Sequence, residues 1–156
     1  MSGFSKTFTL PFESKIPSYT DDFLRNASLL KFKLKYFRRQ IYLTYKKQKS
    51  LEIHSILPKH QKILWINLSA PSLGDSLMDL SSRILLHNKQ VELFTNVKNA
   101  SLYQHDKIFK AVFTKKEELI NFKYDLIIVD SFSTRSICIK HQIAPRTNYV
   151  GMFGLF

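Results

Sequence analysis

The chain has 156 residues, of which 44% are hydrophobic, so it can build a packed core; this argues against wholesale disorder. Its 4 glycines and 5 prolines are too few for a loop-rich all-β fold or a low-complexity chain. A formal net charge of +12 predicts attraction to a polyanion, which could be nucleic acid, an anionic membrane face or a phosphorylated glycolipid.

Several features predict a cytoplasmic protein. Cys138 is the only cysteine, so no intrachain disulfide can form, and a reducing compartment is the simpler interpretation. Residues 1–15 lack the charged start and the apolar core of a signal peptide. No stretch approaches the roughly 18 apolar residues that a membrane-spanning helix needs.

Residues 1–60 are predicted to form an arm followed by a long basic amphipathic helix. Residues 1–19 hold two prolines and show no sustained period, and a helical pattern then begins at Thr20 or Asp21. The apolar stripe of this helix, spaced by three and four residues, consists of Phe23, Ala27, Leu30, Leu34, Phe37, Ile41 and Tyr45. The basic residues that lie largely off the stripe include Lys31, Lys35, Arg38 and Arg39.

The basic helix has two main interpretations. In the first, the apolar stripe docks on the core of the domain and the bases face water. In the second, the helix lies on an anionic membrane surface, which Lys31, Lys35, Arg38 and Arg39 contact. RNA binding is a weaker third interpretation, because no RNA-binding motif accompanies the charge, and we expect no nucleic-acid partner.

Residues 61–156 are predicted to form a Rossmann-like α/β domain, and Pro58 marks the boundary before it. Strand and helix patterns alternate along these residues, as they do in a parallel sheet with helices on its faces. The expected strands are 62–68, 90–95, 108–113, 124–130 and one that begins at residue 148. The expected helices are 76–87, 115–121 and 134–142, with a loop or short helix over 99–105.

Ligands of an open parallel sheet bind beyond the carboxyl ends of its strands. Three segments should reach that edge: residues 69–75, then Thr95 with Asn96, and then residues 130–133. No glycine-rich dinucleotide loop or P-loop pattern is present, which disfavours nicotinamide-dependent and P-loop enzymes. The histidines are scattered and no cluster has the spacing of metal ligands, so we expect neither a metal nor a cofactor.

Asp75 is the residue of most interest at this edge. It follows a predicted strand, a loop and Gly74, and it opens a predicted helix. One hypothesis is a helix cap, in which the carboxylate accepts hydrogen bonds from the free amides of the first turn. The other is a general base that takes a proton from a sugar hydroxyl, with Gly74 allowing a tight turn of the backbone. The sequence by itself favours the cap.

Two blocks within about residues 62–151 resemble the bacterial heptosyltransferases, glycosyltransferase family 9. The first is the apolar strand 62–66, followed by Ser72-Leu73-Gly74-Asp75 and an apolar helix. The second is the strand 124–130, followed by Arg135-Ser136 and then Tyr149-Val150-Gly151. Their order and spacing are similar to those of the family. The chain departs from the family pattern at Ala70-Pro71 and at Ser81.

The resemblance implies the N-terminal, acceptor-side half of a GT-B glycosyltransferase, in which Asp75 is the base of an inverting transfer. It implies a nucleotide-sugar donor, a phosphorylated lipid A–core acceptor and no metal. Residues placed to bind substrate would be Ser72, Gly74, Thr95, Asn96, Asp130 and Arg135. In the family a second domain holds the donor. It is missing from this sequence, so we expect the isolated chain to have little or no transferase activity.

The alternative function is a non-catalytic basic module that binds anionic membrane or glycolipid through residues 21–48. Both interpretations place the protein in the cytoplasm. The membrane interpretation would make it peripheral on the cytoplasmic face of the inner membrane.

Overall fold

The computed structural model describes residues 30, 34, 37–68, 70, 72–120, 122–129 and 134–151. The chain divides into two compact units, Met1–Leu34 and Lys35–Phe156, and every helix and strand named below belongs to the second. The predicted arm and the predicted start of the basic helix lie outside the described residues. Within the described part of the chain, no helix has both the length and the apolar character to cross a bilayer.

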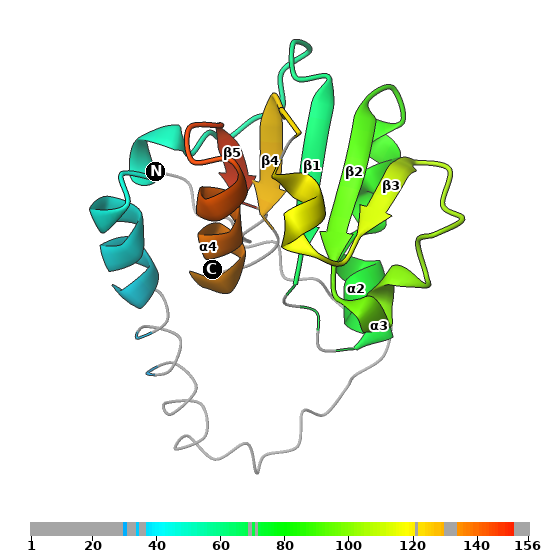
Figure 1. Cartoon of the computed structure of the whole chain (residues 1–156), viewed down its shortest axis with the longest axis horizontal. Helices are drawn as coiled ribbons and strands as arrows, with labels where there is room; N and C mark the ends of the chain where they lie inside the picture. The colour runs from blue at the N-terminus through cyan, green and yellow to red at the C-terminus, as the bar shows by residue number, and fades with distance from the viewer. Residues whose placement is uncertain are drawn as a thin grey trace, which may run out of the picture. The chain divides into compact units, whose positions relative to one another are not determined.

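Five parallel strands form the centre of the second unit (Figure 1). In chain order they are β1 (Lys62–Asn67), β2 (Gln90–Thr95), β3 (Phe109–Phe113), β4 (Leu126–Val129) and β5 (Tyr149–Gly151). Their spatial order is β3-β2-β1-β4-β5, so the direction of winding reverses between β1 and β4, where sheets of this kind bind ligands. The prediction of an α/β fold with a Rossmann-like parallel sheet is confirmed.

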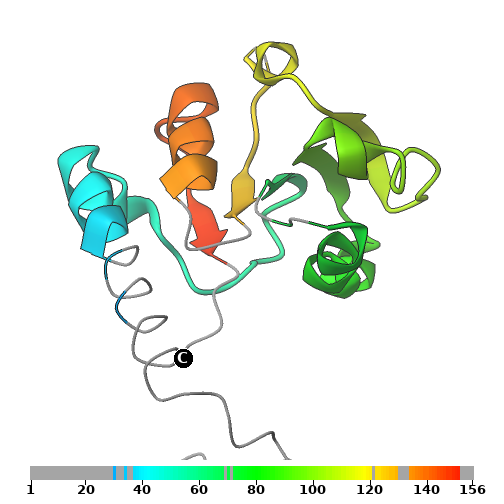
Figure 2. The ribbon, with the colours of Figure 1, turned by 90° about the horizontal axis from the view of Figure 1, so that it is seen from below.

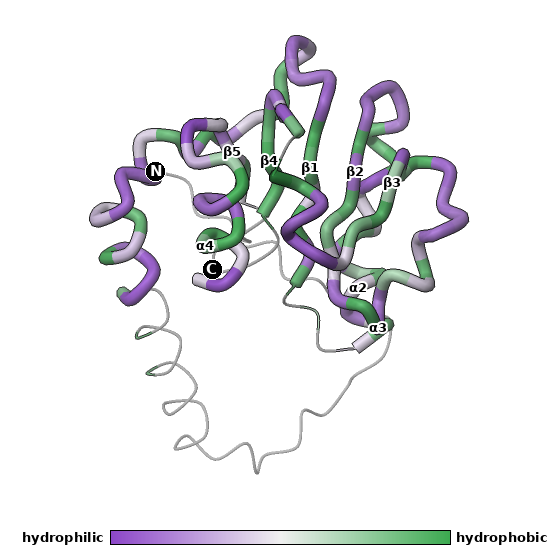
Figure 3. The backbone as a smooth tube through the Cα atoms, viewed as in Figure 1, coloured by the Kyte–Doolittle hydropathy of each residue, from purple (hydrophilic) through white to green (hydrophobic). Residues whose placement is uncertain are grey.

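The central strands are apolar because helices cover both of their faces (Figure 3). All residues of β1 after Lys62 are buried, and so is all of β4. Successive side chains point to opposite faces of the sheet. Leu64 and Ile66 therefore join one buried cluster, whereas Ile63 and Trp65 join another.

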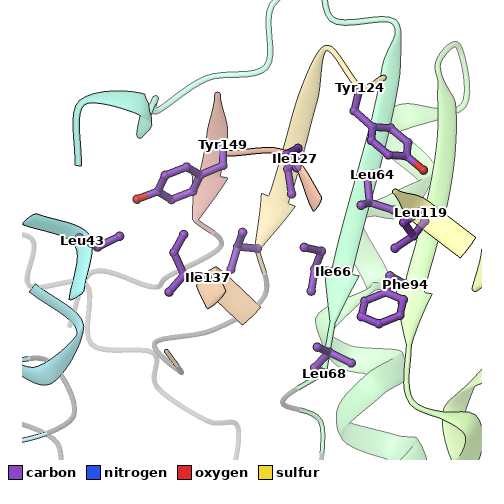
Figure 4. Close-up of a cluster of buried hydrophobic side chains, with 12 residues drawn as sticks. Leu43, Leu64, Ile66, Leu68, Phe94, Leu119, Tyr124, Ile127, Ile137 and Tyr149 are labelled. Carbon is purple, nitrogen blue, oxygen red and sulfur yellow. The ribbon is translucent and has the colours of Figure 1, made fainter. Parts of the chain in front are cut away.

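Helices lie on both faces of this sheet, and Figure 2 shows α4 and α2 on opposite sides of it. The cluster that contains Leu64 receives Leu119 and Ile137 from one set of helices (Figure 4). The cluster that contains Trp65 receives Leu80 from another set. The helices of the first set are η3 (Lys116–Leu119) and α4 (Thr134–Ile143), and those of the second are α2 (Leu73–Asp79) and η2 (Ser81–Leu86). The remaining short helices are η1 (Lys49–Leu51) and α3 (Val97–Ala100).

The helix predicted over residues 76–87 is the largest difference in this region. The chain instead forms α2, turns at Leu80 and continues as the 3-10 helix η2. The carbonyl oxygen of Leu80 accepts the backbone N–H of Arg83 at 3.1 Å and also its guanidinium Nη1 at 3.1 Å. These bonds favour the tighter turn over a continued α-helix. The predicted strands, in contrast, agree with the observed strands to within two residues at each end.

Residues 37–45 are helical, but the helix does not dock through its predicted apolar stripe. Leu43, which is off the stripe, is buried in the same cluster as Tyr149 and Ile137 (Figure 4). The described stripe residues are all exposed, and they are Leu30, Leu34, Phe37, Ile41 and Tyr45. The first interpretation, a stripe packed on the core, is therefore wrong for Phe37, Ile41 and Tyr45, the stripe residues of the second unit.

The helix ends at residue 45, and the chain turns through Lys47, whose φ of 52° is the left-handed conformation. The following segment then joins the edge of the sheet. Glu52 forms an isolated parallel bridge with Tyr149, and the Ile53 N–H donates to the Tyr149 carbonyl oxygen at 2.9 Å. Residues 37–53 thus pack beside β5 and α4 within the second unit.

Candidate functional site

The site begins at the first turn of α2, directly after β1. Ser72 is the N-cap: its backbone is extended, with φ −128° and ψ 167°, and its Oγ accepts the N–H of Asp75 at 3.2 Å. The same hydroxyl donates to Asp75 Oδ2 at 2.6 Å. This arrangement resembles a capping box, with the acid three residues after the cap. The hypothesis that Asp75 itself is the cap is wrong, because Ser72 has that position.

The Asp75 carboxylate is exposed and lies in the first turn of α2. Negative groups are favoured there because the unpaired N–H groups of a helix N-terminus carry partial positive charge. The hydrogen bond from Ser72 leaves the second carboxylate oxygen available to another group. Chemically, such a carboxylate can accept a proton or a hydroxyl hydrogen bond from a molecule that reaches this edge.

Gly74 is not needed for a special backbone conformation. No described glycine has a positive φ, and a Cβ at Gly74 would lie 3.8 Å from Ser72 Oγ, which is ordinary van der Waals contact. The expectation of a glycine-dependent tight turn is wrong. The turn is formed instead by the Ser72 cap.

A buried polar network holds α2 against the end of β1. Ser76 Oγ donates to Asn67 Oδ1 at 3.0 Å and lies 3.0 Å from the Tyr103 hydroxyl. Asn67 Nδ2 in turn donates to Asp79 Oδ2 at 3.1 Å. Because these groups satisfy one another, burying them is tolerated and the orientation of α2 is restricted. The first turn of α2, with Asp75, is positioned by this network.

The electrostatics of the network follow from its burial. Burial raises the pKa of Asp79, with a smaller upward contribution from the negative charge of Asp75, whereas the hydrogen bond from Asn67 lowers it. Burial likewise raises the pKa of Tyr103, so its hydroxyl stays protonated. Beside Tyr103, Arg83 Nε donates to Asp106 Oδ2 at 2.6 Å, which ties η2 to the loop before β3.

Thr95 and Asn96 have structural positions at the end of β2. Thr95 is fully buried and pairs in register with Asn67, so its side chain is not presented to solvent. Asn96 is half-buried and caps α3, where its Oδ1 accepts the N–H of Asn99 at 2.9 Å. Within the described residues, Thr95 Oγ1 and both side-chain polar atoms of Asn99 are buried without a hydrogen-bond partner. Ordered water commonly satisfies such groups.

The structure does not bring the remaining predicted residues to α2 as one group. Arg135 is exposed in the first turn of α4, and Arg38 is exposed on the helix 37–45. Arg39 is only 3% exposed, and its Nη2 lies 3.6 Å from Glu52 Oε1, so it does not face solvent as a membrane contact would. The predicted residues Lys31, Lys35 and Asp130 lie outside the described residues.

Asn67, Ser76 and Tyr103, which hold the helix that carries Asp75, were not identified from the sequence. Asn67 is a polar end to an apolar strand, and Ser76 is a small polar residue one position after Asp75. Those two features were visible in the sequence as polar residues where the pattern expects apolar ones. Tyr103 carried no such signal, because its pairing with Ser76 is a contact across 27 positions of the chain.

Comparison of the chain with protein-family models, with curated proteins and with solved structures finds no match. The resemblance of residues 62–151 to the heptosyltransferases therefore stays a prediction. Among the described residues, no group of three or more His, Cys, Asp or Glu side chains could hold a metal ion.

Proposed function

We propose that residues 61–156 are the acceptor-side half of a heptosyltransferase-type glycosyltransferase, in which Asp75 is the general base. The observation that carries the proposal is an exposed carboxylate at the start of α2, directly after the central strand of the parallel sheet. That strand borders the switch point at which such sheets bind ligands. The sequence blocks that resemble the family supply the class of reaction.

The proposed reaction is a single displacement. An acceptor hydroxyl oxygen attacks the anomeric carbon of the donor sugar and forms the new glycosidic bond. The bond between that carbon and the nucleotide phosphate breaks, and the nucleotide leaves with the electron pair. Asp75 takes the proton of the attacking hydroxyl, and the configuration at the anomeric carbon inverts.

Other residues would position this base. The Ser72 hydroxyl, 2.6 Å from Asp75 Oδ2, fixes one carboxylate oxygen and leaves the other for the acceptor. The network of Asn67 and Ser76 holds the helix that carries both residues. We assign these as positioning residues because none of them would touch the reacting atoms.

The proposed partners are a nucleotide-sugar donor and a phosphorylated lipid A–core acceptor. A net charge of +12 favours an acceptor that carries phosphate groups. Arg135, in the first turn of α4, and Asn96, at the end of β2, are the further residues that we propose to contact the acceptor. Donor binding is assigned to a second Rossmann-like domain, as the family resemblance implies.

The direct test uses the whole chain with a deacylated, phosphorylated core saccharide, so that lipid plays no part. We expect saccharide binding by calorimetry, and sugar transfer from a nucleotide-heptose only when a family donor domain is added. Asp75→Asn should lower transfer by about a hundredfold or more, as loss of a general base does, while binding changes little.

Glu117→Gln is the matched control, because it neutralises another exposed carboxylate, on η3. It should leave both binding and transfer unchanged. Absence of saccharide binding at low ionic strength would refute the proposed acceptor. Transfer that survives Asp75→Asn intact would remove Asp75 from the role of base.

A further inference from the structure

One side of the described unit carries many basic side chains and few acidic ones. We call it the basic flank and define it as residues 37–51 and 134–151, which pack together through Leu43, Ile137 and Tyr149. These residues include eight Lys or Arg and no Asp or Glu. A surface of this kind attracts polyanions and is favoured near an anionic bilayer.

The same flank exposes apolar side chains on one face of its helix. Phe37 is 63% exposed, Ile41 54% and Tyr45 78%. Their spacing of four residues places them along one stripe of the helix 37–45. Each is large and exposed, although burying an aliphatic or aromatic side chain is favourable.

Basic groups border this stripe. Arg38 is exposed within the helix, and Lys47 and Lys49 are exposed just after it. Lys46 Nζ lies 5.1 Å from the centre of the Tyr45 ring, within the range of a cation–π contact. An apolar stripe bordered by Lys and Arg, with an aromatic residue at each end, is the pattern of a helix that lies in a membrane interface.

The opposite face of the helix is fixed to the domain, so the stripe is presented outward. Leu43 is 1% exposed within the core, and Arg39 pairs with Glu52. Just beyond the helix, Lys140 Nζ donates to Gln48 Oε1 at 2.6 Å, and Gln48 Nε2 donates to the Pro145 carbonyl oxygen at 3.1 Å. The face of the helix that carries Arg39 and Leu43 is thus buried against the domain, and the face that carries Phe37, Ile41 and Tyr45 stays at the surface.

We propose that the basic flank docks on an anionic lipid bilayer, with Phe37, Ile41 and Tyr45 in the interface and Arg38, Lys46 and Lys49 at the head groups. The charge favours this occupant over a protein partner or a second copy of the chain, because two copies of the flank would repel each other. The proposal does not depend on the proposed transferase activity. It adds a surface that would hold the domain where lipid-linked acceptors reside.

Co-sedimentation of the whole chain with vesicles of equal parts phosphatidylglycerol and phosphatidylcholine tests the proposal. We expect binding at low salt that weakens as salt is added, and little binding to pure phosphatidylcholine. The double variant Phe37→Asp and Ile41→Asp should weaken binding by about tenfold or more, because it removes apolar insertion and adds negative charge.

The matched control for that variant is Ile84→Asp with Leu85→Asp on η2. These residues are 60% and 76% exposed, so the control makes the same change in charge at similar exposure outside the flank. It should lower binding by less than about threefold, through its net charge alone. Equal losses in the two double variants would overturn the proposal.

A second pair of variants separates local charge from net charge. Arg38, Lys46 and Lys49 changed to Gln should weaken vesicle binding by about tenfold or more. Lys98, Lys107 and Lys110 changed to Gln carry the same loss of charge outside the flank and should have a much smaller effect. Equal losses, or no vesicle binding at low salt, would overturn the proposal. Tight RNA binding without vesicle binding would assign the flank to nucleic acid instead.

Discussion

The basic flank differs from the opposite side of the sheet in its ratio of acidic to basic residues and in the partners of its buried lysine. We call residues 72–106, which contain α2, η2, β2 and α3, the α2–α3 side. It holds four Asp or Glu and three Lys or Arg, against no acid and eight bases in the basic flank. On the α2–α3 side, Arg83 pairs with Asp106 at 2.6 Å. On the basic flank, the buried Lys140 has only neutral partners among its described hydrogen bonds.

The difference shows in the protonation of buried groups. Burial lowers the pKa of Lys140 to about 8, because its partners are the Gln48 side-chain oxygen, the Pro145 carbonyl oxygen and the Tyr149 ring at 5.2 Å. Neutral oxygens offset less of the desolvation cost than a carboxylate would. Lys140 thus differs from the other buried base of the flank, Arg39, which pairs with Glu52 just outside the flank. Desolvation of the Lys140 ammonium group without an acidic partner among the described residues lowers the stability of the fold.

The largest effect should come from truncating one core leucine on each side. Leu43→Ala and Leu80→Ala should each lower the free energy of unfolding by about 2–5 kcal/mol in urea titration, since both side chains are almost fully buried. If the two sides open separately, hydrogen exchange in residues 37–51 should rise only in Leu43→Ala. Equal acceleration on both sides in both variants would show that they unfold as one.

The next effect concerns pH and tests the unusual burial of Lys140. Its pKa is about 8 in the folded chain, against 10.5 as the ordinary value. Between these values the unfolded chain binds more protons, so the free energy of unfolding should rise as pH increases from about 8 towards 10. Linkage limits this gain to roughly 3 kcal/mol. Lys140→Met should remove the rise, as measured by urea unfolding at several pH values.

The high end of that pH range provides an internal control. Burial raises the pKa of Tyr42 and of Tyr149 to about 12, above their ordinary value of 10.0. Above pH 10 the two tyrosine hydroxyls lose their protons in the unfolded chain before they do in the folded chain. The free energy of unfolding should therefore fall again, both in the unmodified chain and in Lys140→Met. A rise below pH 10 that persists in Lys140→Met would show that another group causes it.

The smallest effect concerns the cap on the α2–α3 side. Ser72→Ala removes the acceptor for the Asp75 N–H and the 2.6 Å hydrogen bond to the Asp75 carboxylate. We expect a loss of about 1 kcal/mol in stability. Ser81→Ala, at an exposed position in the first turn of η2, should change stability by less than about 0.5 kcal/mol. Equal losses would contradict the capping role of Ser72.

The predicted site was only partly assembled from sequence. The edge position of Asp75 followed from a strand pattern and a turn, both of which are local in the chain. The cap was assigned to the wrong residue, since Ser72 and Asp75 are both good helix-starting residues and only the backbone angles distinguish them. Thr95 was expected to contact substrate, but its side chain is buried. Successive side chains of a strand point to opposite faces of the sheet, and the burial of each depends on how the helices cover that face.

The sequence by itself determined the alternation of strands and helices and hence the parallel sheet, because apolar periodicity and turn residues act over short stretches of chain. Only the tertiary structure decided which face of the helix 37–45 is buried. Docking through its apolar stripe was one of the two main interpretations, yet Leu43, Arg39 and Gln48 contact the domain, because Tyr149, Glu52 and Lys140 supply specific partners there. Tyr149 and Lys140 lie roughly a hundred positions from Leu43 and Gln48, a separation at which local periodicity carries no information, whereas Glu52 is close to Arg39 in the chain.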